Sequence, residues 1–384
     1  MKIGIVLSNT PAYSETFFIS KIKGLQKKGF EVVLIVGKHQ SNFNFCPVLV
    51  QPKINTFYFI ITLLKTLWFS ISSCSVLKRF IHLERRSGNS RKNILKKIIV
   101  NLHILKIRKL DWLHFGFATQ AIGRENIASA IGAKMAVSLR GFDINVYPLK
   151  HKESYELLWK KVDKVHSISN YLLSEAYRLG LNETVDYKII TPAVKIMNAS
   201  IHEKNALIKI TTIGRLHWIK NYSDILKSLK LLKDKNINFS YHIIGEGNLM
   251  EELKYQVYEY GLDTCIIFEG KLSHQETLNL LKLSDLYIQY SYSEGFCNAV
   301  LEAQSLGIPA IVSNGGALSE NVIHTKTGWV VEKNNPKLLA QKIEEVLSLS
   351  DAKKQEMRNT AIERVRKDFN IEKQENEFIN FYTN

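Results

Sequence analysis

The chain has 384 residues, which is long for one hydrophobic core and fits two domains of about 150–200 residues each. Its 45% apolar and 23% charged residues argue against wholesale disorder. The 52 Lys and Arg against 36 Asp and Glu give a net charge of +16, and the four cysteines, which lack any metal-type spacing, argue against a zinc site and indicate a reducing compartment.

The N-terminal half alternates strands and helices. Its first apolar run is too short for a signal peptide, and loop residues follow it at once. The predicted elements are strands 2–8, 31–37, 111–115, 135–139, 164–168 and 187–191, and helices 15–28, 119–130, 154–161 and 170–179. Strands that alternate with helices predict a parallel sheet covered on both faces.

A hydrophobic and basic insertion, about residues 53–109, interrupts this order. Ile54–Leu77 has Lys65 as its only charge and is almost long enough to span a bilayer. A true span would split the βα domain, so we expect a buried or membrane-facing helical hairpin. Lys78–Lys109 contains eleven basic residues and one acidic residue. This stretch predicts attachment to an anionic membrane surface, with a solvated basic face as the alternative; no nucleic-acid-binding motif accompanies it.

Residues 192–205 are polar and irregular, which predicts a linker, after which the pattern starts again. The predicted elements are strands 207–213, 241–244, 266–268, 286–290 and 329–331, and helices 221–234, 249–260, 275–283, 336–348, 351–367 and 371–382. We therefore expect a first domain over 1–195, a second domain over 206–367, and a C-terminal helix, 368–384, that packs back toward the first domain.

Candidate ligand-binding groups follow the predicted strands. In open parallel sheets, ligands bind beyond the carboxyl ends of the strands. The groups at such ends are Ser8-Asn9, His114-Phe115-Gly116, Arg140-Gly141, Gly214-Arg215, Gly245-Glu246, Glu269-Gly270 and Ser291–Glu294. If the two domains face each other, all of these groups line one cleft.

Two cations and a helix start predict a phosphate site in the second domain. Arg215 ends a strand, and Lys220 precedes a helix. A second helix that opens at Cys297-Asn298 would offer unpaired N–H groups of Cys297, Asn298 and Ala299. The alternative is that both cations are ordinary surface residues. A P-loop and a dinucleotide-binding glycine motif are both missing from the sequence, which argues against an ATPase or a dehydrogenase.

Two glutamates eight positions apart are candidates for binding hydroxyl groups. Glu302, inside the helix, could accept hydrogen bonds from both hydroxyls of a ribose. The alternative is that its charge only stabilises the first turns of the helix through the helix dipole. Glu294, in the loop before it, could contact a sugar or act as nucleophile or stabiliser, or lie in water. His114 is flanked by apolar residues, where a histidine is usually packed in the core. Only its position at the end of a strand favours a functional role. Asp143 is equally consistent with a turn or cap residue.

Together these motifs resemble retaining glycosyltransferases of the GT-B fold, family 4, over nearly the whole chain. The matching residues are Ser14-Glu15-Thr16-Phe17, His114-Phe115-Gly116, Ser167-Ile168-Ser169, Gly214-Arg215-Leu216 with Lys220, Gly245-Glu246-Gly247, Asp285, Glu294-Gly295-Phe296 with Glu302, Gly307-Ile308-Pro309 and Gly315-Gly316. The resemblance implies two Rossmann-like α/β domains facing each other across a cleft. The opening Ser-Glu-Thr-Phe is similar to enzymes that build bacterial exopolysaccharide, capsule or lipopolysaccharide.

The resemblance also implies residue roles. Glu294, His114, Arg215 and Lys220 would take part in catalysis, with Glu294 on the donor sugar and the two cations on its diphosphate. The implied donor-binding residues are Gly214, Arg215, Lys220, Gly245, Gly295, Phe296, Cys297, Asn298 and Glu302, with Glu302 on the ribose. The implied acceptor-side residues are Ser14, Thr16, Arg140 and Asp143. Arg140 departs from the family, which usually has histidine there; a permanently charged arginine cannot be a general base, but it could bind an anionic acceptor.

We therefore expect a metal-independent, cofactor-free, retaining hexosyltransferase. It would move sugar from a nucleoside diphosphate to a lipid-linked saccharide, in the cytoplasm at the inner face of the cell membrane. The alternatives are a nucleotide-sugar epimerase of the same fold and a non-catalytic membrane-associated subunit of a polysaccharide assembly complex.

Overall fold

The computed structural model describes residues 1–11, 16–39, 43–52, 74–197 and 207–383. The chain forms two compact units. Unit 1 comprises Met1–Ile190 with Gln374–Asn384, and unit 2 comprises Thr191–Lys373. Most of the predicted linker, and the first part of the hydrophobic insertion, lie outside the described residues.

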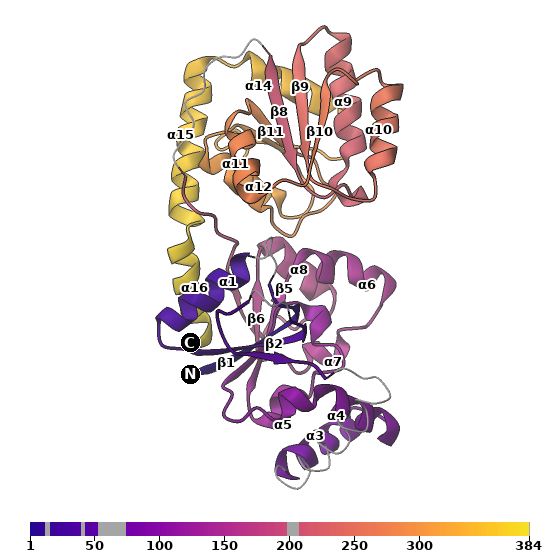
Figure 1. The fold of residues 1–384 in the computed structure, drawn as a ribbon, viewed down its shortest axis with the longest axis vertical. Coiled ribbons are helices and arrows are strands. Elements are labelled where there is room, and N and C mark those ends of the chain that lie inside the picture. The colour runs from indigo at the N-terminus through magenta and orange to yellow at the C-terminus, as the bar shows by residue number, and fades with distance from the viewer. Residues whose placement is uncertain (12–15, 40–42, 53–73, 198–206, 384) are drawn as a thin grey trace. The chain divides into compact units, whose positions relative to one another are not determined.

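Unit 1 is built on a seven-stranded, all-parallel sheet (Figure 1). The strand order is β3-β2-β1-β4-β5-β6-β7. The strands are β1 (Lys2–Asn9), β2 (Glu31–Lys38), β3 (Val48–Val50), β4 (Trp112–Phe115), β5 (Lys134–Leu139), β6 (Lys164–Ser167) and β7 (Asp186–Ile189). Because both faces of such a sheet are covered, strands such as β1 are nearly continuous apolar runs, which made them readable from sequence.

The helices of unit 1 differ more from prediction. They are α1 (Thr16–Lys27), α3 (Cys74–Arg86), α4 (Arg91–Leu105), α5 (Ile127–Ile131), α6 (Tyr147–Lys150), α7 (Glu156–Trp159) and α8 (Asn170–Arg178). The helix predicted over 119–130 is instead a 3-10 turn (Ala118–Gln120) followed by α5, because Gly123 takes a left-handed φ of +76° between them. The short strand β3 and a π-helical turn, Phe142–Val146, were not predicted.

The basic part of the insertion is a helical hairpin. Ser90 caps α4, and α3 packs against both α4 and α5. The fully buried carboxylate of Glu84 accepts hydrogen bonds from Lys97 at 2.8 Å, Asn89 at 2.8 Å and Asn126 at 3.1 Å. These contacts fix the hairpin to the domain. None of the described helices has the length and apolar character needed to cross a bilayer. The hairpin expected over residues 54–77 lies largely outside the described residues.

Unit 2 is a six-stranded parallel sheet of order β10-β9-β8-β11-β12-β13 (Figure 1). The strands are β8 (Ile208–Ile213), β9 (Phe239–Ile244), β10 (Ile266–Gly270), β11 (Leu286–Gln289), β12 (Ala310–Ser313) and β13 (Trp329–Val331). The helices are α9 (Tyr222–Asp234), α10 (Met250–Glu259), α11 (His274–Lys282), α12 (Asn298–Ser305), α13 (Leu318–Asn321), α14 (Pro336–Ser348) and α15 (Asp351–Asp368). Order and bounds follow the predicted elements closely, except for α13, which was not predicted.

The last helix, α16 (Ile371–Thr383), contributes its residues from Gln374 onward to unit 1. Phe378, Phe381 and Tyr382 are buried in the core of that unit. The indole Nε1 of Trp112 donates to the backbone oxygen of Tyr382 at 3.3 Å. The C-terminal segment is therefore an integral part of the first hydrophobic core.

Candidate functional site

Two glycine loops meet at the carboxyl edge of the unit 2 sheet. The N–H of Gly214, after β8, donates to Ile244 O at 2.9 Å, and the N–H of Leu216 donates to Glu246 O at 3.0 Å. Gly245 has a φ of +145°, and a Cβ there would lie 2.1 Å from Gly214 O. Only glycine permits this approach. The contact holds Arg215 at the strand end, where its side chain is exposed and forms no ion pair with any described residue.

Lys220 and Glu294 form an ion pair beside this loop. Lys220 ends a 3-10 turn, Trp218–Lys220, and its Nζ lies 2.6 Å from Glu294 Oε1, with the two side chains 15% and 14% exposed. Burial alone would lower the pKa of Lys220, but the charge of Glu294 and the hydrogen bond to it raise the pKa above its usual value. The lysine is therefore a cation at neutral pH.

Glu294 is held rigidly by its surroundings. Its Oε1 also accepts from Ser291 Oγ at 2.7 Å and Gln289 Nε2 at 3.4 Å. Its backbone oxygen accepts from the N–H of Ala317 at 2.8 Å. Gly316 takes a φ of +65°, and a Cβ there would lie 2.4 Å from Glu294 O. Oε2 accepts no hydrogen bond from the described residues, so one oxygen remains to bind a ligand hydroxyl.

The start of α12 differs from prediction in one respect. The N–H of Cys297 is not unpaired: it donates to Asn321 Oδ1 at 3.0 Å, while Asn321 Nδ2 donates to Cys297 O at 3.1 Å. Cys297 therefore has no free backbone donor for a phosphate. Burial, and then the charge of Glu294, raise the pKa of the Cys297 thiol to about 12, so it is protonated and unsuited to nucleophilic attack.

Glu302 lies within α12, four residues after Asn298, so the two share a helix face. Its Oε1 is 2.8 Å from Nε2 of His274, the first residue of α11, which Ser273 and Glu276 fix by a capping box. The hydrogen bond to Glu302 raises the pKa of His274. The Glu302 side chain is 17% exposed, which leaves it accessible to a small ligand.

Gly295 and Phe296 follow Glu294 in the loop that leads into α12, the helix that contains Glu302. Gly295 is buried, and the Phe296 ring lies 5.7 Å from that of Phe369, packed against Leu301. Phe296 thus anchors the loop to the core.

In unit 1, His114 is fully buried in a chain of hydrogen bonds. Tyr382 O–H donates to His114 Nδ1 at 2.6 Å, His114 Nε2 to Ser138 Oγ at 2.8 Å, Ser138 O–H to His166 Nδ1 at 2.7 Å, and His166 Nε2 to Ile190 O at 3.0 Å. Each group supplies one proton, so the chain is complete only with both histidines neutral. Burial lowers the pKa of His114 and of His166 well below the usual value. The placement favours the packed role of His114 over a substrate contact.

The other unit 1 candidates are also engaged within the protein. The Arg140 guanidinium lies 3.9, 4.7 and 5.4 Å from the ring centroids of Phe17, Phe18 and Phe117, and its side chain is almost wholly buried. Asp143 accepts from the N–H groups of Arg140 and Ala118, the capping role that was the alternative for it. Burial, its largest influence, raises the pKa of Asp143 to about 7. Ser14 and the Thr16 side chain lie outside the described residues.

Comparison with known proteins agrees with this arrangement. Residues 196–368 match the family model described as glycosyl transferases group 1. The chain is 21% identical to WcaL of Escherichia coli over 96% of both chains, and 22% identical to the amylovoran biosynthesis glycosyltransferase AmsK of Erwinia amylovora over 88% and 89%. Its fold matches Anabaena HepE in complex with UDP-glucose at a TM-score of 0.72 and 12% identity, over 99% and 98% of the chains. The chain therefore has the GT-B fold, and these matches support a glycosyltransferase of polysaccharide biosynthesis.

No group of three His, Cys, Asp or Glu side chains in the described parts of the chain could hold a metal ion. Metal-independent transfer stays a prediction.

Three supporting residues of this site were not found by the sequence analysis: His274, Gln289 and Asn321. Each hydrogen-bonds to a predicted residue from a different element. His274 follows Ser273 in the Ser-x-x-Glu pattern of a helix start, which could have placed it at the sheet edge. Gln289 and Asn321 carry no such signal.

Proposed function

We propose that the protein is a retaining, metal-independent hexosyltransferase that uses a nucleoside diphosphate sugar. The Lys220–Glu294 ion pair, next to Gly214-Arg215 and to Glu302, carries this proposal. It puts a carboxylate for sugar hydroxyls within 2.6 Å of a cation. A second carboxylate, for ribose hydroxyls, follows on the adjoining helix. A nucleotide sugar needs these groups together.

The ion pair reduces the repulsion between Glu294 and a bound diphosphate. A diphosphate would be repelled by Glu294 if that carboxylate were unpaired, but Lys220 compensates its charge. Arg215, exposed at the strand end, then supplies charge for the phosphates. As the sugar bond breaks, negative charge grows on the departing diphosphate, and fixed cations stabilise it more than the bound donor. With the Cys297 thiol protonated, we propose attack on the face from which the diphosphate leaves.

The acceptor is proposed from relatives. AmsK is named for amylovoran biosynthesis and WcaL for colanic acid biosynthesis. One protein of similar structure, WaaB, is a lipopolysaccharide outer core galactosyltransferase. We propose a lipid-linked saccharide acceptor in exopolysaccharide, capsule or lipopolysaccharide synthesis, at the cytoplasmic face of the membrane.

A donor screen tests this function. Full-length protein is incubated with labelled UDP-, GDP- and ADP-hexoses, and donor binding and slow hydrolysis are measured with and without EDTA. We expect one donor to be hydrolysed equally in EDTA, with the released sugar first appearing in the donor's anomeric form. Lys220→Met should abolish turnover, while Lys254→Met, an exposed lysine on α10, should not.

The same screen separates the alternatives. A C2-epimerised sugar among the products would indicate an epimerase, whose acid and base groups unit 1 would have to supply; Asp143 there is already hydrogen-bonded. Failure to bind any nucleotide would overturn the transferase and favour a non-catalytic subunit.

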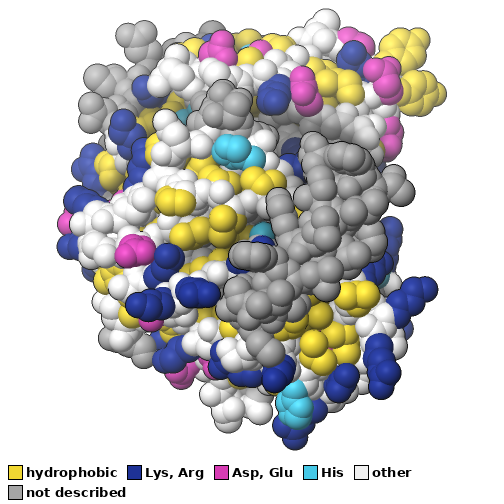
Figure 2. Space-filling view, turned by 60° about the horizontal axis from the view of Figure 1, so that its bottom comes forward, with side chains coloured by type: hydrophobic (Ala, Val, Ile, Leu, Met, Phe, Trp, Pro, Cys, Tyr) yellow, Lys and Arg dark blue, Asp and Glu magenta, His cyan; other side chains and the backbone are white. Residues whose placement is uncertain are grey.

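We further propose that α3 and α4 attach the enzyme to anionic lipid. The exposed basic side chains of this hairpin include Arg85, Arg86, Arg91, Lys92 and Lys96. Figure 2 shows dark blue Lys and Arg side chains along the face that α3 and α4 bring forward. Each basic residue near such a surface contributes about 1 kcal/mol of binding.

Vesicle flotation tests this attachment. Lys92→Gln/Lys96→Gln should weaken binding to phosphatidylglycerol-rich vesicles about tenfold or more, and the exposed unit 2 pair Lys254→Gln/Lys271→Gln should not. Lys97 is left intact, because it pairs with the buried carboxylate of Glu84 at 2.8 Å and its removal would destabilise the fold. Binding that is insensitive both to the double variant and to salt would contradict the proposal.

A further inference from the structure

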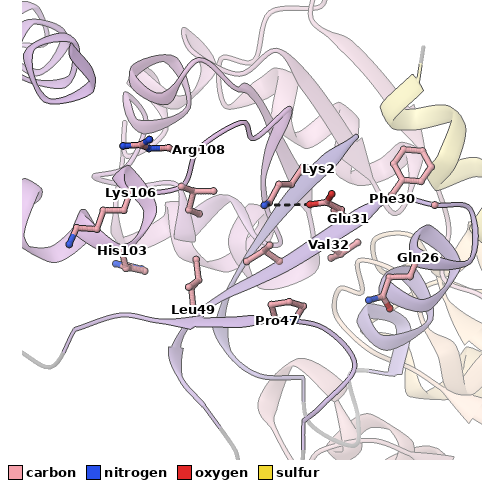
Figure 3. Close-up of a pocket in the computed structure, with 13 residues that line it drawn as sticks. Lys2, Gln26, Phe30, Glu31, Val32, Pro47, Leu49, His103, Lys106 and Arg108 are labelled. Atoms are coloured by element: carbon pink, nitrogen blue, oxygen red, sulfur yellow. Dashed lines mark ion pairs between the residues drawn. The ribbon is translucent and has the colours of Figure 1, made fainter. Parts of the chain in front are cut away.

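Unit 1 contains a pocket of about 940 Å³ at the amino-terminal edge of its sheet (Figure 3). Lys2 and Glu31, the first residues of β1 and β2, lie in its centre, and residues that end α1 and α4 form opposite sides. The carboxyl ends of the same strands lie about 23 Å away, at 3.3 Å per residue. The pocket is therefore separate from the edge that carries the predicted acceptor residues.

Its walls are mainly apolar. Val32, Leu49 and Ile107 line it, together with Phe30 and Pro47. Leu49 belongs to the short edge strand β3, whose side chains are only partly covered by the rest of the domain. A volume near 940 Å³ is at the upper end of ligand-binding pockets, and mostly apolar walls are typical of them. These walls suit a hydrocarbon chain.

The charged side chains that line the pocket are three cations and one carboxylate. Lys2 Nζ lies 3.4 Å from Glu31 Oε2, so this pair is internally neutral (Figure 3). Lys106 and Arg108, just after α4, bring two further positive charges to the side of the pocket opposite Phe30. Burial, and then Arg124, lower the pKa of His103 to about 4, so this histidine adds no charge at neutral pH.

Two cations of the pocket, Lys106 and Arg108, follow directly after α4 of the basic hairpin. Lys106 and Arg108 lie in the same basic stretch as the exposed residues of α3 and α4. An apolar cavity with cations among its lining residues can receive a molecule whose tail is apolar and whose head is anionic. Guanidinium and ammonium groups are the usual protein partners of phosphate.

We propose that this pocket binds a single membrane lipid with an acidic phosphate headgroup. The acyl chain lies against Leu49 and Val32, and the phosphate contacts Lys106 and Arg108. This site does not depend on the transfer reaction. It also differs from the surface attachment proposed above, because it requires a lipid molecule to enter the protein and not a bilayer.

Monomeric lipids test the site without a membrane. Binding of oleoyl lysophosphatidic acid, below its micelle concentration, is measured by calorimetry and native mass spectrometry. We expect one saturable site, with oleoyl lysophosphatidylcholine at least tenfold weaker and glycerol 3-phosphate undetectable. Equal binding of the choline lipid would show a non-specific apolar surface, and equal binding of glycerol 3-phosphate a simple anion site; either result overturns the proposal.

Two variants locate the site. Leu49→Trp fills the pocket and should reduce lysophosphatidic acid binding at least tenfold. Lys106→Gln/Arg108→Gln should do the same, whereas Arg91→Gln/Lys92→Gln, which removes two charges from the exposed start of α4, should change it less than twofold. Nucleotide binding and the melting temperature show whether each variant is folded. If the cations only stabilise the helix end, the double variant melts earlier but binds lipid normally, and the proposal is wrong.

Discussion

The carboxyl edges of the two sheets hold their ionisable groups in opposite ways. In unit 2, the side chains of Lys220 and Glu294 are charged, paired and 15% and 14% exposed. In unit 1, His114 and His166 are 0% and 1% exposed, neutral, and satisfied by protein partners. The same position in the topology therefore has two uses. A strand-end residue is a candidate for chemistry only where solvent, and hence substrate, can reach it.

Neutralising Glu294 tests the carboxyl edge of the unit 2 sheet and should give the largest effect. Glu294→Gln keeps the shape but leaves Lys220 without its counter-charge and weakens any hydrogen bond from a sugar hydroxyl. We expect kcat/KM for transfer to fall about 10²–10³-fold, as for the loss of one transition-state contact. Glu251→Gln, exposed on α10, is the matched control. Transfer within twofold of the unaltered enzyme would remove Glu294 from the site.

His114→Ala tests the buried edge, where we expect lost stability and retained chemistry. The substitution leaves the Tyr382 hydroxyl without its acceptor and removes the donor to Ser138 Oγ, which should lower the free energy of unfolding by about 2–3 kcal/mol in urea titrations. Tyr382→Phe, which removes only one donor, should cost about 1 kcal/mol. If the folded His114→Ala enzyme instead lost most of its kcat at unchanged stability, the histidine would be catalytic and the comparison would fail.

The fold and most candidate residues of the unit 2 site could be predicted from the sequence, for a physical reason. Buried parallel strands are apolar runs, and glycine-rich strand ends are legible locally. The pairing of Lys220 with Glu294, 74 positions apart, and the contact of Tyr382 with His114, 268 positions apart, arise only in tertiary structure. The apolar neighbours of His114 already favoured a packed histidine, but only Ser138, His166 and Tyr382 show what satisfies it.

The pH dependence of stability distinguishes the two edges further. The folded-state pKa of His114 lies below its unfolded value of about 6.5, so the unfolded chain binds more protons as the pH falls below 6.5. The stability due to neutral His114 is thus fully present above pH 6.5 and is lost on acidification, by about 1.4 kcal/mol per pH unit.

His114→Gln removes the histidine that binds this proton, and with it the contribution of His114 to the pH dependence of stability. Between pH 5 and 6, its free energy of unfolding should depend on pH less steeply than that of the unaltered protein, by about 1.4 kcal/mol per unit. His103 and His166, which remain, act in the same direction, and Asp143, whose pKa burial raises to about 7, acts in the opposite one. Taking the difference between the two proteins cancels the contributions of His103 and Asp143, which lie outside this chain of hydrogen bonds. His166 and Lys21, whose charges lower the pKa of His114, belong to the same buried cluster. Equal slopes would mean that His114 is protonated in the folded state.

Glu302 and His274 should give the smallest effect, because this pair is more exposed than the pair of Lys220 and Glu294. His274 is 51% exposed and Glu302 17%. Glu302→Gln should weaken nucleotide binding about tenfold, the value of one charged hydrogen bond to a ribose hydroxyl. His274→Gln keeps a donor near Glu302 and should weaken it no more than about twofold. An equally large loss in both variants would mean that the histidine itself contacts the nucleotide, and the ligand-binding edge would then extend from α12 to the start of α11.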